Sequence, residues 1–127
     1  MQPLNGLFVL DFTTLLPGPL ATLMLAEAGA EVLKIEQPGG ENARHFPPFV
    51  GNESAAFAML NRGKASMTLD LKNGADQEKL VPVIKRADIL VEQFRPGVMD
   101  RLGLGYGDLK KINPGLIYCS ISGYGQS

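Results

Sequence analysis

The sequence predicts an α/β protein in which an open, doubly wound parallel sheet is flanked by helices. Short apolar runs typical of buried strands alternate with segments of helical periodicity, and glycine or proline separates them. The 127 residues, of which 45% are hydrophobic and 20% charged, are enough for the packed core of one domain. We therefore expect a single domain part over residues 1–127, with no second domain and with ligands bound beyond the carboxyl ends of the strands.

The first third of the chain predicts one strand-helix-strand unit. The apolar run 7–12 is typical of a buried strand, and Glu31–Glu36 alternates apolar and charged residues as a second strand does. Between them, residues 18–28 place apolar side chains at helical spacing. Pro19 suits a first helical turn, and Gly29 supplies the left-handed residue that ends a helix.

A long connection and a second unit follow. Residues 37–54 hold prolines and glycines but few periodic apolar positions, which indicates a functional or binding loop. A short helical turn is expected over 55–60 and a strand over 67–71. A helix is expected over 76–87, where Pro82 should kink or shorten it.

The last third predicts a strand over 88–92, short helices over 96–102 and 107–112, and a last strand over 116–121. The polar, glycine-rich residues 122–127 stand where an α/β sheet would normally continue into another helix. We therefore expect the chain to be the front part of a larger fold.

Composition excludes several classes of function. Twelve Lys and Arg against 13 Asp and Glu give a net charge of -1, so we expect no nucleic-acid partner. A single cysteine, Cys119, allows no internal disulfide and no thiolate metal cluster. We interpret Cys119 as a small core residue of a buried strand, and we expect no metal and a cytoplasmic setting. No apolar run predicts a membrane partner or a signal peptide.

Some residues allow both a structural and a functional interpretation. The turn before Pro19 lacks the G-x-G-x-x-G fingerprint, which disfavours an NAD enzyme. The helix start behind this turn would either bind an anion or merely aim the helix. Asp11 and Glu36, at strand ends, would face a ligand or bond to neighbouring loops. His45, the only histidine, is expected to be exposed rather than a general base.

Several blocks in order resemble the N-terminal portion of the family III CoA-transferases, which include formyl-CoA transferase, carnitine CoA-transferase and α-methylacyl-CoA racemase. The resemblance covers essentially the whole chain. The blocks are G-L-F-V-L-D-F at 6–12, L-P-G-P at 16–19, L-A-E-A-G-A-E-V-L-K-I-E at 25–36, P-G-G-E-N-A-R at 38–44, N-R-G-K-A-S-M-T-L-D-L-K at 61–72, A-D-I-L-V-E-Q-F-R-P-G-V-M-D-R-L-G-L-G-Y at 87–106 and N-P-G-L-I-Y-C-S-I-S-G-Y-G-Q-S at 113–127.

This resemblance implies a Rossmann-like large domain that binds coenzyme A or an acyl-CoA, and an interlocked or strand-swapped homo-oligomer. Lys72 and Arg101 would reach the adenosine phosphate or the pyrophosphate. The residues that the resemblance places at the CoA site are Thr14, Leu16, Gln37, Leu69, Lys72 and Arg101, with Arg44 and Lys64 as weaker candidates.

Two departures bear on the substrate. Leu16 stands where formyl-CoA transferases have a glutamine near the thioester, and Gln37 stands where they have an arginine. The resemblance therefore argues against formyl-CoA transfer. The L-P-G-P turn is closer to the racemases, which favours a branched or other organic acyl group.

The family's reacting groups are not expected in this chain. Its transferases use an aspartate that forms a mixed anhydride with the acyl group, and its racemases use a His/Asp pair. Both lie after the segment that corresponds to 122–127, so the resemblance implies no catalytic residue here and no turnover by the chain alone. The alternatives are a non-catalytic assembly module that oligomerises by strand exchange, and a decayed fragment without a ligand.

Overall fold

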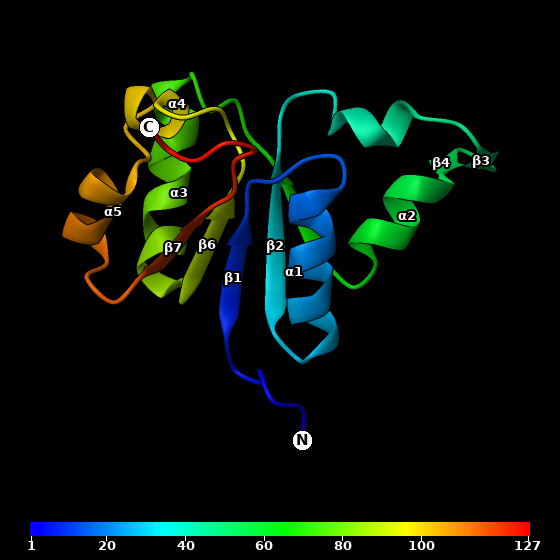
Figure 1. Ribbon diagram of the computed structural model, residues 1–127, viewed down its shortest axis with the longest axis horizontal. Coiled ribbons are helices and arrows are strands. Elements are labelled where there is room, and N and C mark those ends of the chain that lie inside the picture. Colours follow the sequence, from blue (N-terminus) through cyan, green and yellow to red (C-terminus); the bar gives the residue numbers. More distant parts are fainter.

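The computed structural model describes residues 1–127 as a five-stranded parallel sheet with helices on both faces (Figure 1). The strand order is β5-β2-β1-β6-β7, and a separate hairpin pairs β3 with β4. The sheet of the predicted α/β class is thus confirmed. The elements are β1 (Phe8–Asp11), α1 (Pro17–Glu27), β2 (Glu31–Glu36), η1 (Asn42–His45), β3 (Phe49–Val50), β4 (Glu53–Ser54), α2 (Ala55–Asn61), β5 (Ala65–Thr68), α3 (Gly74–Arg86), β6 (Ile89–Glu92), α4 (Val98–Arg101), α5 (Tyr106–Ile112) and β7 (Ile117–Ser120).

The first strand-helix-strand unit follows the local sequence signals. Pro17 occupies the start of α1, where a missing N–H leaves no hydrogen bond unmade. Gly29 adopts φ +109°, the left-handed conformation that allows the chain to leave the helix and enter β2. β2 then pairs in parallel with β1, with Val9 opposite Val32.

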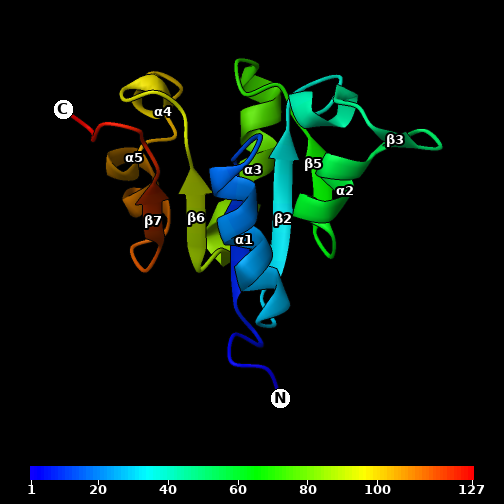
Figure 2. The ribbon, with the colours of Figure 1, turned by 45° about the vertical axis from the view of Figure 1, so that its right-hand side comes forward.

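Alternation along β1 divides the core into two layers. Phe8 and Leu10 face α3 and α5 and join the larger cluster, to which α3 contributes the buried Leu80 and Ile84. Val9 faces the opposite side and joins a smaller cluster beneath α1. In two views turned by 45°, α1 lies on one face of the sheet and α3 on the other (Figure 2). Burial on both faces explains why β1 and β6 are continuous apolar runs.

Most element bounds lie within two residues of the predicted ones, and three segments depart from the predictions in other ways. β5 spans Ala65–Thr68 rather than the predicted 67–71: Thr68 is the last residue paired with β2, and the Leu69 side chain that follows is buried in the core. α3 continues through Pro82 and is not shortened by it. No helix of the structure is long and apolar enough to cross a membrane. The predicted loop 37–54 contains η1 and the β3-β4 hairpin, which projects from the body of the molecule (Figure 2).

The interpretation of Cys119 as a core residue is wrong: its side chain is exposed. β7 is an edge strand, and Cys119 lies opposite Val91 on the face that α1 covers over β1 and β2. No helix packs over β7 on that face, so its neighbour on the same face, Ile117, is also 62% exposed. The apolar sequence of β7 predicts a buried strand, whereas the position of β7 at the edge of the sheet leaves one of its faces exposed.

Candidate functional site

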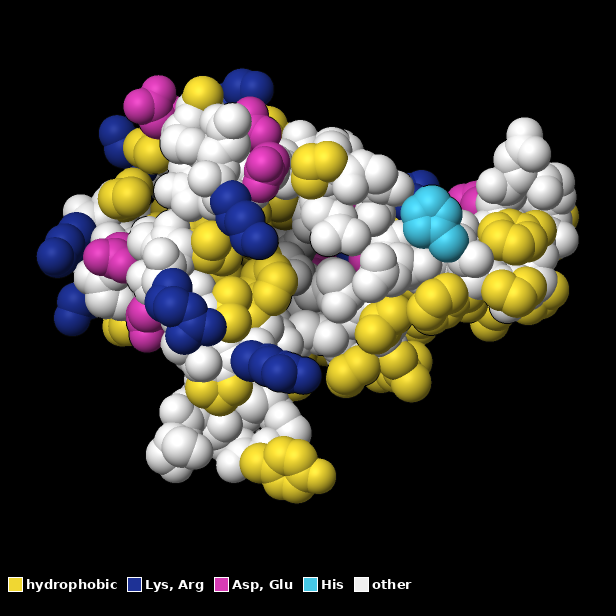
Figure 3. Space-filling model, turned by 90° about the horizontal axis from the view of Figure 1, so that it is seen from above, with side chains coloured by type: hydrophobic (Ala, Val, Ile, Leu, Met, Phe, Trp, Pro, Cys, Tyr) yellow, Lys and Arg dark blue, Asp and Glu magenta, His cyan; other side chains and the backbone are white.

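A pocket of about 480 Å³ opens at the carboxyl edge of the sheet, and we call it the strand-end pocket. Seen from above the strand tips, hydrophobic side chains lie exposed near the middle of this face with Lys and Arg side chains beside them (Figure 3). Half of the lining residues are hydrophobic. They are Phe12, Thr14, Ile35, Glu36, Gln37, Pro38, Glu41, Leu69, Asp70, Leu71, Lys72, Phe94, Val98 and Leu102.

Four strands deliver these residues. Thr14 follows β1, Gln37 follows β2, and Phe94 follows β6, while the segment Leu69–Lys72 follows β5. Between β1 and β6 the order of the sheet reverses, because the chain builds outward first through β2 and β5 and then through β6 and β7. The crevice at such a reversal is where open α/β sheets bind their ligands.

The turn between β5 and α3 holds the backbone of Lys72 in place. The Lys72 amide donates to Asp70 Oδ1 over 3.0 Å, and the Asp70 amide donates to Asp76 Oδ2 over 2.8 Å. The side chain of Lys72 is exposed and forms no ion pair. A cation is thus presented at the pocket without a carboxylate partner of its own.

Arg101, at the end of α4, is a second exposed cation without an ion pair. Its neighbour Leu102 lines the pocket. The guanidinium lies over Gly97, where a Cβ atom would approach Arg101 Nη1 to 3.1 Å. Gly97 also has φ +87°, so both space and backbone conformation favour glycine there.

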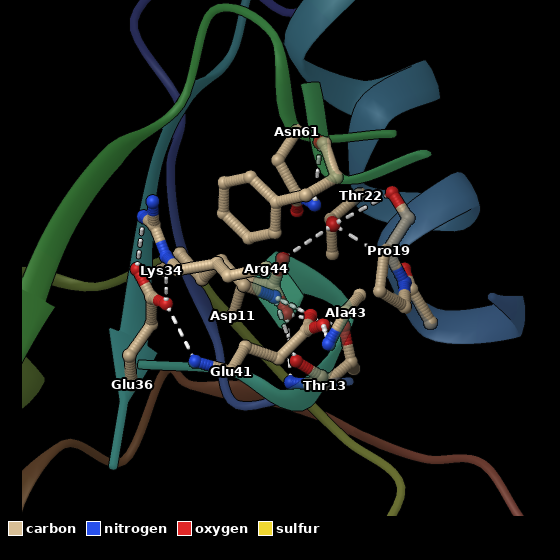
Figure 4. A network of polar contacts seen from close by, with 12 residues as sticks. Asp11, Thr13, Pro19, Thr22, Lys34, Glu36, Glu41, Ala43, Arg44 and Asn61 are labelled. Carbon is tan, nitrogen blue, oxygen red and sulfur yellow. Dashed lines mark hydrogen bonds and ion pairs between the residues drawn. The ribbon is translucent and has the colours of Figure 1, made fainter. Parts of the chain in front are cut away.

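Behind the opposite wall lies a cluster of charged side chains that we call the buried ion network: Asp11, Lys34, Glu36, Glu41, Arg44 and Lys64. Figure 4 labels all of them except Lys64. Asp11 accepts from the hydroxyl groups of Thr13 and Thr22 and pairs with Lys64 Nζ at 3.1 Å. Lys64 also donates to the Pro19 carbonyl and to Asn61. Burial lowers the pKa of the Lys64 ammonium below its ordinary value, although the Asp11 carboxylate opposes this shift.

The rest of the network joins β2 to η1. Lys34 Nζ lies 2.8 Å from Glu41 Oε1 and donates to the Thr13 carbonyl. The side chains of Lys34 and Glu41 are each only 1% exposed. Glu36 accepts two hydrogen bonds of 2.7 Å from Arg44. Burial raises the pKa of Glu36, but hydrogen bonds from Arg44 and Ser66 outweigh it, so the pKa falls from 4.5 to about 2. The charges of both pocket-lining glutamates are thus compensated from behind.

The start of α1 does not offer free donors to an anion. Pro17 and Pro19 have no N–H, and the Gly18 amide donates to Gln93 Oε1 over 2.9 Å. A Cβ atom at Gly18 would lie 2.2 Å from Thr13 Cβ, so glycine is required for this close approach. Of the two interpretations of the first turn, the structure favours the one in which the turn aims the helix.

Comparison with known proteins identifies the family. The model of CoA-transferase family III matches residues 4–127. The chain belongs to this family. Its relatives include the acetyl-CoA:oxalate CoA-transferase of Acetobacter aceti, 49% identical over 98% of this chain and 32% of the relative. The succinyl-CoA:glutarate CoA-transferase of Mus musculus is 44% identical over 100% of this chain and 30% of the relative.

Solved structures of the family have the same fold. The crystal structure of a CAIB/BAIF family protein from Brucella suis superimposes with a TM-score of 0.93 at 39% identity, covering 99% of this chain and 35% of that one. The predicted resemblance to the N-terminal portion of family III CoA-transferases is therefore confirmed. The chain spans about a third of the length of the relatives that it matches.

The structure separates the predicted site residues into two groups. Thr14, Gln37, Leu69 and Lys72 line the strand-end pocket. Arg101 does not line it, but the next residue, Leu102, does. The others lie elsewhere: Leu16 is 57% exposed at the start of α1, Arg44 pairs with Glu36, and Lys64 pairs with Asp11.

Sequence reasoning missed the apolar part of the pocket, formed by Phe12, Phe94, Val98 and their neighbours. The available signal was position, because Phe12 and Phe94 follow strand ends at the same sheet edge. Asp11 and Glu36 bond to neighbouring loops, and His45 is exposed as expected. No three His, Cys, Asp or Glu side chains gather where they could hold a metal ion.

Proposed function

We propose that this chain forms the coenzyme A binding part of a CoA-transferase, with CoA held in the strand-end pocket. The observation that carries the proposal is the position of Lys72 and Arg101, two exposed cations without ion pairs, beside a largely apolar pocket at the strand-order reversal. Coenzyme A carries phosphate groups, which lysine and arginine bind through charge-assisted hydrogen bonds. Membership of a CoA-transferase family supports a CoA thioester as the substrate.

In this proposal the two sides of the pocket bind different parts of the ligand. Lys72 and Arg101 contact the adenosine phosphate or the pyrophosphate. Leu69 and Phe94 contact the less polar parts, and the polar groups of Thr14 and Gln37 orient the ligand at the strand tips. Arg44 and Lys64 act indirectly, by holding the loops of the opposite wall through Glu36 and Asp11.

The proposed role of the chain is binding rather than nucleophilic attack. The carboxylates that line the pocket are each engaged within the chain: Glu36 by Arg44, Glu41 by Lys34, and Asp70 by the amide of Lys72. A carboxylate whose charge is already stabilised by an ion pair or by hydrogen bonds is a weaker nucleophile. We propose that a carboxylate outside these 127 residues reacts with the acyl group.

We propose transfer of CoA to a dicarboxylic acid as the activity of the whole protein. The relatives named above are transferases, and their names give oxalate and glutarate as acceptors. These names favour a transferase over the racemase that the L-P-G-P turn favoured. The acceptor acid is a proposal about the whole protein. Binding of CoA is a separate proposal that can be tested on this chain alone.

Calorimetric titration of the chain with coenzyme A tests the proposed site. We expect binding that weakens about tenfold in Lys72→Ala and in Arg101→Ala, the loss expected for one charge-assisted hydrogen bond. Lys85→Ala is the matched control, since Lys85 lies near the far end of α3, away from the strand tips. Absence of binding by the folded chain, or an equal loss in Lys85→Ala, would contradict the proposal.

A further inference from the structure

Gln77, in the first part of α3, bridges two separate segments of the pocket wall. Its side-chain nitrogen donates to the Leu71 carbonyl over 2.5 Å and to the Leu102 carbonyl over 2.9 Å. Both partners are acceptors, which fixes the orientation of the amide group. Gln77 is half-buried and does not itself line the pocket, whereas Leu71 and Leu102 do.

The two carbonyls that Gln77 binds belong to the residues next to Lys72 and Arg101. Leu71 precedes Lys72 in the turn after β5, and Leu102 follows Arg101 at the end of α4. Leu71 and Leu102 are 31 positions apart in the sequence. Through these two hydrogen bonds Gln77 ties the β5-α3 turn to the end of α4, so it sets the spacing between the backbones that carry the cations.

α4 depends on such contacts for its position. It has four residues, too few for a stable isolated helix. Met99 anchors one side of α4 in the core, and Gln77 holds the carbonyl of Leu102, its C-cap residue. The carbonyls at a helix end need partners outside the helix. The hydrogen bond from Gln77 therefore satisfies the Leu102 carbonyl and fixes the backbone at the end of α4, where Arg101 is the last helical residue.

We infer that Gln77 is a positioning residue for coenzyme A, which holds Lys72 and Arg101 at the spacing needed to bind the phosphate groups together. This role rests on the proposed function, because it acts on the two cations proposed to contact the ligand. Gln77 contributes no charge and no ligand contact. Its removal weakens binding because the cations must then be ordered when the ligand binds.

A double-mutant cycle separates positioning from general structural support. Gln77→Met keeps the length of the side chain but removes both donors, and we expect it to raise the Kd for coenzyme A about fivefold. In the Lys72→Ala/Arg101→Ala background the same substitution should change the Kd less than about twofold, because no cations remain to be positioned. Glu78→Met, at the exposed neighbouring position of α3, is the matched control and leaves the Kd unchanged.

The possible results are distinguishable. An unchanged Kd in Gln77→Met, while Lys72→Ala weakens binding, overturns the role of Gln77 but not the site. An equal loss in both backgrounds also overturns it, because that is the result of a merely structural role. No binding by the folded wild-type chain overturns both the site and this role. Gln77→Leu, which is uncharged and cannot donate, should reproduce the loss if Gln77→Met folds poorly.

Discussion

The two sides of the strand-end pocket use cations in opposite ways. Behind one wall, Lys34 and Lys64 are 1% exposed and each is paired with a carboxylate. At the other wall, Lys72 and Arg101 are exposed and unpaired. A cation near the pocket is therefore available to bind a ligand only where no carboxylate of the chain already pairs with it. Compensated cations hold the loops that form the pocket.

Among substitutions of these cations, loss of a buried one should have the largest effect on the free energy of unfolding. Lys64→Met removes one partner of a buried ion pair and leaves the Asp11 carboxylate, which is fully buried, without its cation. We expect the free energy of unfolding to fall by about 3–5 kcal/mol, measured by urea denaturation.

Lys72→Met is the control for this measurement, since it makes the same chemical change at an unpaired, exposed site. It should alter the free energy of unfolding by no more than about 0.5 kcal/mol. A loss below about 1 kcal/mol in Lys64→Met, or a similar loss in both variants, would show that the two cations do not differ in structural role.

Lowering the pH should reduce the free energy of unfolding by a smaller amount. The pKa of Glu36 is about 2 in the folded chain and 4.5 ordinarily, because Arg44 and Ser66 stabilise its carboxylate. The unfolded chain therefore takes up this proton first as the pH falls. The stability that Glu36 contributes is present above pH 4.5 and is lost progressively toward pH 2. We expect Glu36 to contribute about 2 kcal/mol to the free energy of unfolding. This is less than the full pKa shift implies, because Arg44 is 38% exposed and solvent screens its pairing with Glu36.

Glu36→Gln tests this assignment. The variant should be less stable at neutral pH, and between pH 4.5 and 2 its free energy of unfolding should fall less steeply than that of the wild type. Chemical denaturation at several pH values measures the slope. Identical slopes in the two proteins would show that Glu36 is not the group that titrates.

Local patterns predicted the sheet because its strands and helices are specified by neighbouring residues. The run 7–12 and the signals from Pro19 and Gly29 act over a few positions and led to the correct first unit, although α1 begins at Pro17. The end of β5 was misplaced because alternation continues through Leu69 and Leu71 after strand pairing has stopped at Thr68. Alternation indicates which face a side chain takes, but it does not specify where the strand loses its partner.

The candidate site was predictable only in part. The family resemblance named Lys72 and Arg101, and strand ends gave the edge at which Thr14 and Gln37 meet. The pairing of Lys64 with Asp11 joins positions 53 residues apart, and no local signal reports it. The same holds for the Gln77 bridge, which spans 25 residues to Leu102. Such contacts depend on how the elements pack, so sequence periodicity leaves them undetermined.

Nitrogen-15 NMR titration of the chain with coenzyme A would show which of these cations lie at the binding site, because it reports on the backbone amides of the whole chain at once. We predict the largest shifts at Thr14, Lys72, Phe94 and Arg101, with little change at Lys64. Shifts concentrated around Lys64 and the β3-β4 hairpin, with the amides at 69–72 unchanged, would contradict the division of cations on which the account rests.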